Sequence, residues 1–413
     1  MTRAFPILLA LLLAACSTSS PTATAPPTPT ATSASTPTTN PTTPPTSAPP
    51  TTPPTPTPSP SEAASCAQTT LASLTEGQRI GQLFAVGLAK DRFDAASRDA
   101  LAHAHIGSWW FTAKTDVGVE AIRSVSDAVQ AASTDASTGG VGAFIAANQE
   151  GGRIQALSGP GFDRIPSAVT QGTWSAATLE QRATRWGREL LDAGVNLDFA
   201  PVADVVPKGT ERANAPIGQL KREYGSDPTT VARSVAAFVD GMHAAGVATT
   251  AKHFPGLGRV AANTDFASGV VDTVTKPDDP YLLPFRRAID HGVPAVMMSL
   301  ATYERIDPDR LAAFSWPTIG GILEDDLGFT GIVMSDSLSA EAVSSIPAGT
   351  RAVAFLDDGG DMIVVRPVDM ALDMVKAVAA HAKESDWFRR RIDNAALHVL
   401  RAKDAVGLLP CSG

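Results

Sequence analysis

The sequence predicts an α/β protein whose main part is a single (β/α)8 barrel of the TIM type. From Leu71 onward, short apolar runs typical of buried strands alternate with longer amphipathic stretches, which is the pattern of repeated β-α units. Residues 66–413 have about the length of one such barrel domain. An open doubly wound sheet would alternate in the same way, but no Gly-x-Gly-x-x-Gly turn follows the first strand. The barrel is therefore the favoured fold.

The N-terminus is typical of an export signal. Arg3 precedes an apolar run from Phe5 to Leu13, which is too short to cross a bilayer as a mature helix. The segment Leu13-Ala14-Ala15-Cys16 then resembles a bacterial lipobox, so we expect residues 1–15 to be a lipoprotein signal peptide and Cys16 to be lipidated. The alternative is an ordinary signal peptide that is cut elsewhere, with Cys16 discarded.

Residues 16–65 are predicted to be a disordered linker. From Ser17 to about Ser61 the chain consists almost entirely of Ser, Thr, Pro and Ala, with no apolar period that could offset the entropy of ordering it. Such a tether holds a domain away from a membrane surface, and its Ser and Thr residues are candidates for O-glycosylation.

Two of the three cysteines lie at opposite ends of the predicted domain. With Cys16 assigned to the lipid, Cys66 and Cys411 remain, and in an exported protein such a pair is expected to form a disulfide. Two free thiols or a metal site are less compatible with export and with this placement. The net charge of -9 and the scattered Lys and Arg residues indicate no nucleic-acid surface. We expect a monomer that meets the membrane through the lipid anchor only.

The predicted strands and helices alternate in the order that a barrel requires. The clearest helices, with apolar residues at three- and four-residue spacing, are 177–193, 230–245 and 282–290. The eight candidate strands are residues 83–88, 106–111, 141–147, 195–200, 247–251, 295–299, 331–335 and 361–365.

Polar side chains follow four of these strands, at the rim where a barrel places its chemistry. The third strand leads into Asn148-Gln149-Glu150-Gly151-Gly152-Arg153, the fourth into Asp204, the fifth into Lys252-His253 and the seventh into Asp336. Each could cap a following helix, but four at equivalent places favour a shared pocket. Asp336 is the sharpest candidate for a nucleophile, because Lys or His from neighbouring strands would keep it ionised. Its alternative role is to cap a short helix over 339–348.

These residues resemble glycoside hydrolase family 3, in its single-barrel β-N-acetylglucosaminidase branch and in actinobacterial lipoproteins of that branch. The matching motifs extend over most of the domain in the expected order. They are Gln149-Glu150-Gly151-Gly152-Arg153, Leu197-Asp198-Phe199-Ala200-Pro201-Val202-Ala203-Asp204, Lys252-His253-Phe254-Pro255-Gly256-Leu257-Gly258 and Gly328-Phe329-Thr330-Gly331-Ile332-Val333-Met334-Ser335-Asp336.

The resemblance implies a retaining mechanism with a covalent glycosyl-enzyme intermediate on Asp336. It places Lys252, His253 and Arg222 among the substrate-binding residues, and it implies no metal and no other cofactor. Asn148 stands where the family usually has a sugar-binding Asp, and an Asn still forms hydrogen bonds to hydroxyls, although weaker ones.

The acid/base position departs from the family. This branch typically carries an Asp and a His two residues apart on a loop, whereas here Asp265 is present and Ala267 replaces the His. Asp265 is therefore either the acid itself or a plain loop residue, with the proton coming from elsewhere.

The sequence thus predicts an exported, lipid-anchored hydrolase on the outer face of the membrane or in the cell-wall space. It would remove terminal β-linked N-acetylglucosamine from cell-wall glycans or muropeptide fragments. The alternatives are a catalytically weak or silent carbohydrate-binding lipoprotein on the same barrel, motivated by Ala267 and Asn148, and a β-glucosidase-type hydrolase of the same family.

Overall fold

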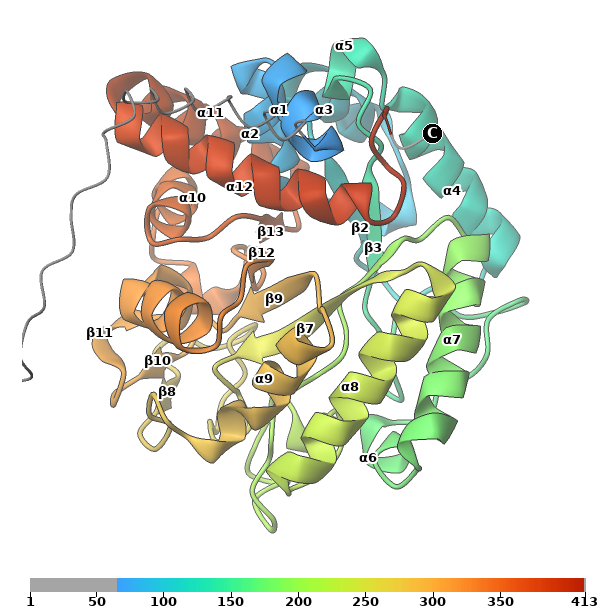
Figure 1. Ribbon diagram of the computed structural model, residues 1–413, viewed down its shortest axis with the longest axis vertical. Helices are drawn as coiled ribbons and strands as arrows, with labels where there is room; N and C mark the ends of the chain where they lie inside the picture. The colour runs from blue at the N-terminus through green and yellow to red at the C-terminus, as the bar shows by residue number, and fades with distance from the viewer. Residues whose placement is uncertain (1–64, 412–413) are drawn as a thin grey trace, which may run out of the picture. The chain divides into compact units, whose positions relative to one another are not determined.

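The computed structural model describes residues 65–411, and within them the predicted barrel is confirmed (Figure 1). One parallel eight-stranded sheet has the order β12-β9-β7-β6-β3-β2-β1-β13. An isolated parallel bridge between Met334 and Met362 brings its two ends together. The barrel strands are β1 (Phe84–Leu88), β2 (Ser108–Phe111), β3 (Phe144–Ala147), β6 (Leu197–Asp198), β7 (Ala248–Phe254), β9 (Ala295–Met298), β12 (Ile332–Ser335) and β13 (Ile363–Val365).

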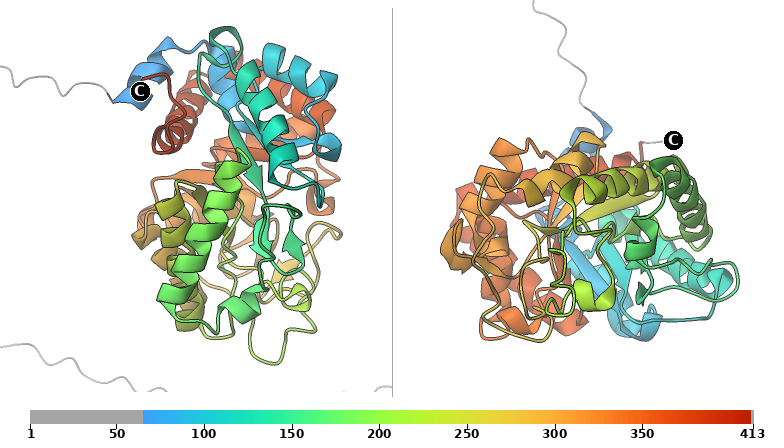
Figure 2. Two further views of the ribbon diagram at one scale, coloured as in Figure 1. Left: turned by 90° about the vertical axis from the view of Figure 1, so that its right-hand side faces the viewer. Right: turned by 90° about the horizontal axis from the view of Figure 1, so that it is seen from below.

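Helices surround this sheet on the outside (Figures 1 and 2). Their apolar faces pack on strands that are buried along their whole length, which explains why the strands read as continuous apolar runs. The helices are α1 (Cys66–Ser73), α2 (Glu76–Gln82), α3 (Ala95–Ala104), α4 (Val119–Ala132), α5 (Asp135–Thr138), α6 (Ala168–Gln171), α7 (Ala176–Asp192), α8 (Pro228–Ala245), α9 (Leu283–Asp290), α10 (Ala348–Asp357), α11 (Val368–Glu384) and α12 (Asp386–Asp404), with a π-helix, η5, over Pro317–Asp326.

Short strands and 3-10 turns lie in the loops at the rim of the barrel. Two small sheets are formed there, one from β4 and β5 and the other from β8, β10 and β11. The remaining short strands and 3-10 turns are β4 (Gln149–Gly151), β5 (Ile154–Gln155), β8 (Val271–Asp272), β10 (Thr302–Tyr303), β11 (Asp307–Leu311), η1 (Ala89–Asp91), η2 (Gly218–Leu220), η3 (Pro280–Leu282), η4 (Ala312–Phe314) and η6 (Glu341–Val343).

The short helix expected over 339–348 does not form. That stretch contains only the 3-10 turn η6, and α10 begins at Ala348 after its N-cap Pro347. Proline disfavours the helical conformation in the residue before it, which prevents a helix from running through this point. The prediction of a helix capped by Asp336 is therefore wrong.

The two ends of the described chain meet beside the barrel. A disulfide joins Cys66, the first residue of α1, to Cys411, with Cα atoms 5.9 Å apart. Around it, Ala67 and Leu74 pack with Val141, Leu400 and Leu409 in a small apolar cluster. The predicted signal peptide, Cys16 and nearly all of the linker lie outside the described residues.

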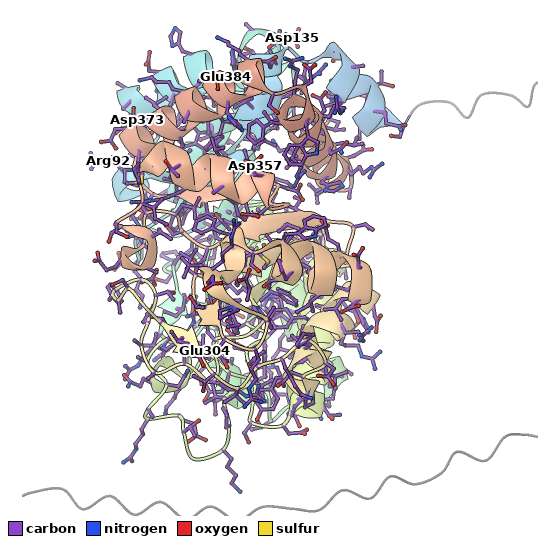
Figure 3. The ribbon with its side chains drawn as sticks, turned by 90° about the vertical axis from the view of Figure 1, so that its left-hand side faces the viewer. Arg92, Asp135, Glu304, Asp357, Asp373 and Glu384 are labelled. Carbon is purple, nitrogen blue, oxygen red and sulfur yellow. A yellow bond between two sulfur atoms is a disulfide. The ribbon has the colours of Figure 1, made fainter. Side chains whose placement is uncertain are left out.

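Charged side chains are spread over the helical exterior. Figure 3 shows this for Asp373 and Glu384 on α11, which point away from the barrel. No helix within residues 65–411 has both the length and the apolar character needed to cross a membrane. In the same range, no three His, Cys, Asp or Glu side chains are arranged to hold a metal ion.

Candidate active site

A cavity of about 370 Å³ opens at the carboxyl ends of the barrel strands. This size lies within the range of small-molecule pockets in proteins. The cavity brings together all six residues that were predicted as catalytic or substrate-binding: Asn148, Arg222, Lys252, His253, Asp265 and Asp336.

Arg222, Lys252 and His253 form one wall of the cavity, the cationic wall, and Glu150 holds the first two of them. Its carboxylate accepts two hydrogen bonds of 2.8 Å from Nε and Nη2 of Arg222, and Nζ of Lys252 lies 2.6 Å from its Oε1. Burial disfavours ionisation, but the charges of Arg222 and Lys252 together lower the pKa of Glu150 to about 2. The three side chains therefore form a buried ionised cluster at neutral pH.

Lys252 also fixes Asn148. Its Nζ donates to Oδ1 of Asn148 at 2.8 Å, and both side chains line the cavity. Lys252 and the next residue, His253, share the wall because the pairing of β7 with β9 shifts register between Lys252 and Phe254. In a regular strand, neighbouring side chains would point to opposite faces.

Asp204 orients His253. Oδ2 of Asp204 lies 2.8 Å from Nδ1 of His253, while its Oδ1 accepts the backbone N–H groups of His253 and Leu257. A carboxylate next to Nδ1 favours the proton on that nitrogen. Nε2 is then left as the acceptor, and it lies 3.4 Å from Nη2 of Arg222.

Asp336 directly follows β12 and is partly exposed to the cavity. Its Oδ1 accepts the N–H of Ser337 at 2.7 Å, and its own N–H donates to the carbonyl oxygen of Met298. Lys252 and His253 line the same cavity, but within residues 65–411 their ion pairs are with Glu150 and Asp204 rather than with Asp336. Asp336 is left free to approach a reacting atom.

Asp265 lies on the loop that forms the rim of the cavity. The loop is tied to the segment after Asp336, because the N–H groups of Glu341 and Ala342 donate to the carbonyl oxygens of Asp265 and Thr264. Asp265 is on an exposed stretch, but its carboxylate faces the cavity, where desolvation and the charge of Asp336 raise its pKa. A carboxyl group with a raised pKa is suited to donate a proton.

Aromatic and apolar side chains complete the cavity. Trp110 and Phe199 lie with their ring centroids 6.0 Å apart, and Leu257 and Met297 also contribute to the lining. Arg366, which follows β13, places its guanidinium 5.5 Å from the centroid of the Trp110 ring. An apolar wall opposite a few convergent polar groups is typical of a site for a small organic ligand.

Asp198 lies beneath this cavity and is fully buried. Its Oδ1 accepts the N–H of Gln149, whereas its Oδ2 has no hydrogen-bond partner among the described residues. Burial raises the pKa of Asp198 to about 7, opposed by the Gln149 N–H and by the charge of Lys252. Through Gln149, Asp198 holds the backbone next to Asn148.

Sequence reasoning did not assign roles to Glu150, Asp204, Trp110 or Arg366. Glu150 and Asp204 were visible as polar residues after strands, but nothing in the sequence showed which cations they would pair with. Trp110 was hidden inside the apolar run that predicted β2, and Arg366 is a single charged residue after the last strand.

The described domain is similar to known proteins over most of its length. Residues 75–402 match the family described as glycosyl hydrolase family 3 N-terminal domain. A protein named beta-hexosaminidase from Stenotrophomonas maltophilia is 32% identical over 336 residues, which cover 78% of this chain and 92% of that relative.

Two solved structures are also similar. One is a beta-N-acetylhexosaminidase from Beutenbergia cavernae, 44% identical with a TM-score of 0.79, and the match covers 80% of this chain and 99% of the other. The second is a glycoside hydrolase family 3 beta-N-acetylglucosaminidase from a Paenibacillus species, 28% identical with a TM-score of 0.75, covering 81% of this chain and 63% of the other.

Proposed function

Because the chain belongs to glycoside hydrolase family 3 and is a glycosidase of the β-N-acetylhexosaminidase type, we propose that Asp336 is its nucleophile and Asp265 its general acid/base. The observation that carries this assignment is the single cavity that holds both carboxyl groups. Asp336 follows β12 and forms no ion pair with any cation in the described part of the chain, and Asp265 lies on the rim with a raised pKa. Two carboxyl groups in different environments are what a retaining glycosidase requires.

The reaction divides into two displacements. Asp336 attacks the anomeric carbon and forms a glycosyl-ester bond, while the bond to the leaving oxygen breaks and Asp265 gives that oxygen its proton. Water then attacks the anomeric carbon, Asp265 takes the proton from this water, and the ester bond to Asp336 breaks. The sugar is released with its original anomeric configuration.

The cationic wall binds the sugar during both steps. Arg222, Lys252 and His253 present donors and an acceptor that are already oriented by Glu150 and Asp204, so little reorganisation accompanies substrate binding. Trp110 and Phe199 offer apolar surface to the faces of the ring. We propose terminal β-linked N-acetylglucosamine as the sugar held here.

We further propose that the natural substrates are cell-wall glycans or muropeptide fragments met outside the cytoplasm. The export signal, the lipobox-like Cys16 and the long Ser/Thr/Pro linker support this location. Labelling with a radioactive fatty acid tests the anchor, and the Cys16→Ser variant is expected to lose both the label and the membrane association.

The first test is hydrolysis of 4-nitrophenyl β-N-acetylglucosaminide by the full-length protein, with Asp336→Asn as the control. This leaving group departs with little acid assistance, so the assay measures the contribution of the nucleophile Asp336 separately from that of the general acid. We expect release by the native protein and a loss of at least about 1,000-fold in the variant. Binding of N-acetylglucosamine without release by the native protein would favour a carbohydrate-binding role, in line with Ala267 and Asn148.

A further inference from the structure

Arg366 is the cation of the cavity that the proposed mechanism leaves unused. It follows β13, lines the cavity beside Trp110, and is exposed. Its backbone N–H donates to Oγ of Ser339, which fixes the position of the chain at this point.

The other cations of the cavity are neutralised within the protein. Arg222 and Lys252 share the carboxylate of Glu150, and His253 faces the carboxylate of Asp204. Arg366 differs from them, because no carboxylate within residues 65–411 forms an ion pair with its guanidinium. Its contact in the cavity is the face of Trp110, which leaves the N–H groups at the guanidinium edge available.

The position of Arg366 identifies the part of the substrate that it meets. Arg366 is exposed at the mouth of the cavity, whereas Arg222 and Lys252, with 12% and 2% of their side chains exposed, lie deeper on the wall that holds the sugar. A terminal sugar in the enclosed part of the cavity directs the leaving group toward the mouth. Arg366 therefore faces the leaving-group side of the bond that is cut.

We propose that Arg366 is a specificity-determining residue that binds a carboxylate on the leaving-group part of the substrate. This inference rests on the proposed function of the cavity. A guanidinium with unpaired N–H groups matches a carboxylate in two parallel hydrogen bonds, which a neutral group of the same shape cannot accept equally well. The pair forms at the mouth of the cavity, where solvent is present, so we expect a moderate preference.

The test compares two matched disaccharides in which N-acetylglucosamine is β-linked either to a uronic acid or to the corresponding uronamide. The amide keeps the shape of the carboxylate and removes its charge. For the native protein we expect kcat/KM to be about 5- to 10-fold higher for the uronate, mainly through a lower KM. In Arg366→Gln this ratio is expected to fall to about one, and Arg366→Lys should retain part of it.

Arg305→Gln is the matched control, because Arg305 is also exposed but does not line the cavity. It removes the same charge and should leave the uronate preference unchanged. A native protein without a preference, or an Arg366→Gln variant that keeps it, would overturn the proposal. An equal loss on both disaccharides would show that Arg366 only maintains the structure of the site.

The same proteins separate this inference from the proposed function. If the native protein fails to hydrolyse 4-nitrophenyl β-N-acetylglucosaminide, the proposed activity is wrong. Calorimetric titration with the two disaccharides then measures the same preference as a ratio of binding constants. A uronate preference that disappears in Arg366→Gln would still support the carboxylate site, and equal affinities for both disaccharides would reject it.

Discussion

Glu150 holds Arg222 through two hydrogen bonds, each 2.8 Å long, and thereby fixes the guanidinium at the edge of the catalytic cavity. The same carboxylate binds Lys252, so one anion orients two cations that come from distant parts of the chain. Within residues 65–411, the pairing leaves Asp336 without a cation bound to it. A nucleophile without such a partner can reach the sugar.

Replacing Glu150 by Gln should damage substrate binding more than the chemical step. The amide preserves the shape but leaves Arg222 and Lys252 as two buried cations with no counter-charge, so Arg222 is expected to move. We expect KM to rise at least about 10-fold and stability to fall by about 3–5 kcal/mol, as for other broken buried ion pairs. Steady-state kinetics and urea unfolding measure both effects, and an unchanged KM would contradict the role given to Glu150.

Replacing Asp265 by Asn should affect substrates according to their leaving group. A general acid contributes about 100- to 10,000-fold when the leaving group is poor and much less when it is good. The variant is therefore expected to lose far more activity on a natural disaccharide than on 4-nitrophenyl β-N-acetylglucosaminide. Equal losses on both substrates would mean that the proton comes from another group.

The pH profile of the native enzyme gives an independent measurement of Asp265. Asp265 must be protonated to act as the acid, so the rate of the first displacement falls as pH rises through its pKa. Desolvation and Asp336 raise this pKa, whereas Arg222, His253 and Arg366 lower it. The alkaline limb for disaccharides should therefore move to higher pH in Arg366→Gln and disappear in Asp265→Asn. No movement in Arg366→Gln would mean that its charge does not act on Asp265.

The fold was predictable because each barrel strand is buried along its length and therefore leaves a continuous apolar run in the sequence. The predicted strand 195–200 is longer than β6 itself, which covers Leu197–Asp198, since burial continues into the loop that follows. The expected helix over 339–348 failed for a local reason, namely the proline at position 347.

The sequence predicted the individual residues of the site, but it did not predict which side chains they would pair with. Lys252, His253 and Asp336 stand at strand ends, which a barrel places on one rim. The contact between Glu150 and Arg222 joins residues that are 72 positions apart, and no periodicity encodes such a pair. Lys252 and His253 lie in the same cavity as Asp336, but the sequence did not show that the buried carboxylates Glu150 and Asp204 would form the ion pairs with them.

Replacing Asp204 by Asn should misorient His253. The carboxylate accepts from Nδ1, and an amide with its oxygen on the two backbone N–H groups would present a donor to the ring instead. The proton would then move to Nε2 and change the group that faces Arg222 and the substrate. We expect kcat/KM to fall about 100-fold or more. Nitrogen NMR of His253 should show the exchanged tautomer, and an unchanged tautomer would contradict this reasoning.

Replacing Asp198 by Asn should change the pH dependence of stability. Burial raises the pKa of Asp198 from 3.8 to about 7, so the folded protein keeps the proton in a range where the unfolded chain releases it. This group therefore lowers stability progressively as pH rises from about 4 to about 7. The Asn variant should gain about 2–4 kcal/mol relative to native protein between pH 4.5 and pH 8, measured by urea unfolding at both values. A constant difference between the two proteins would show that Asp198 is ionised throughout.

Replacing Lys403 by Met should weaken the closure of the barrel at its amino end. Nζ of Lys403, on α12, donates to Oε1 of Gln82 and to the backbone carbonyl oxygens of Gly107 and Gly142, which precede β2 and β3. Methionine fills similar space but removes the Lys403 donor from Oε1 of Gln82 and from the carbonyl oxygen of Gly142, at a cost of about 1–3 kcal/mol each, while the carbonyl oxygen of Gly107 keeps the N–H of Phe144. We therefore expect a loss of about 3–5 kcal/mol with little change in KM, because these contacts lie at the opposite end of the strands from the cavity. Lys383→Met on the exposed face of α11 is the control, and similar unfolding midpoints for the two variants would refute this role of Lys403.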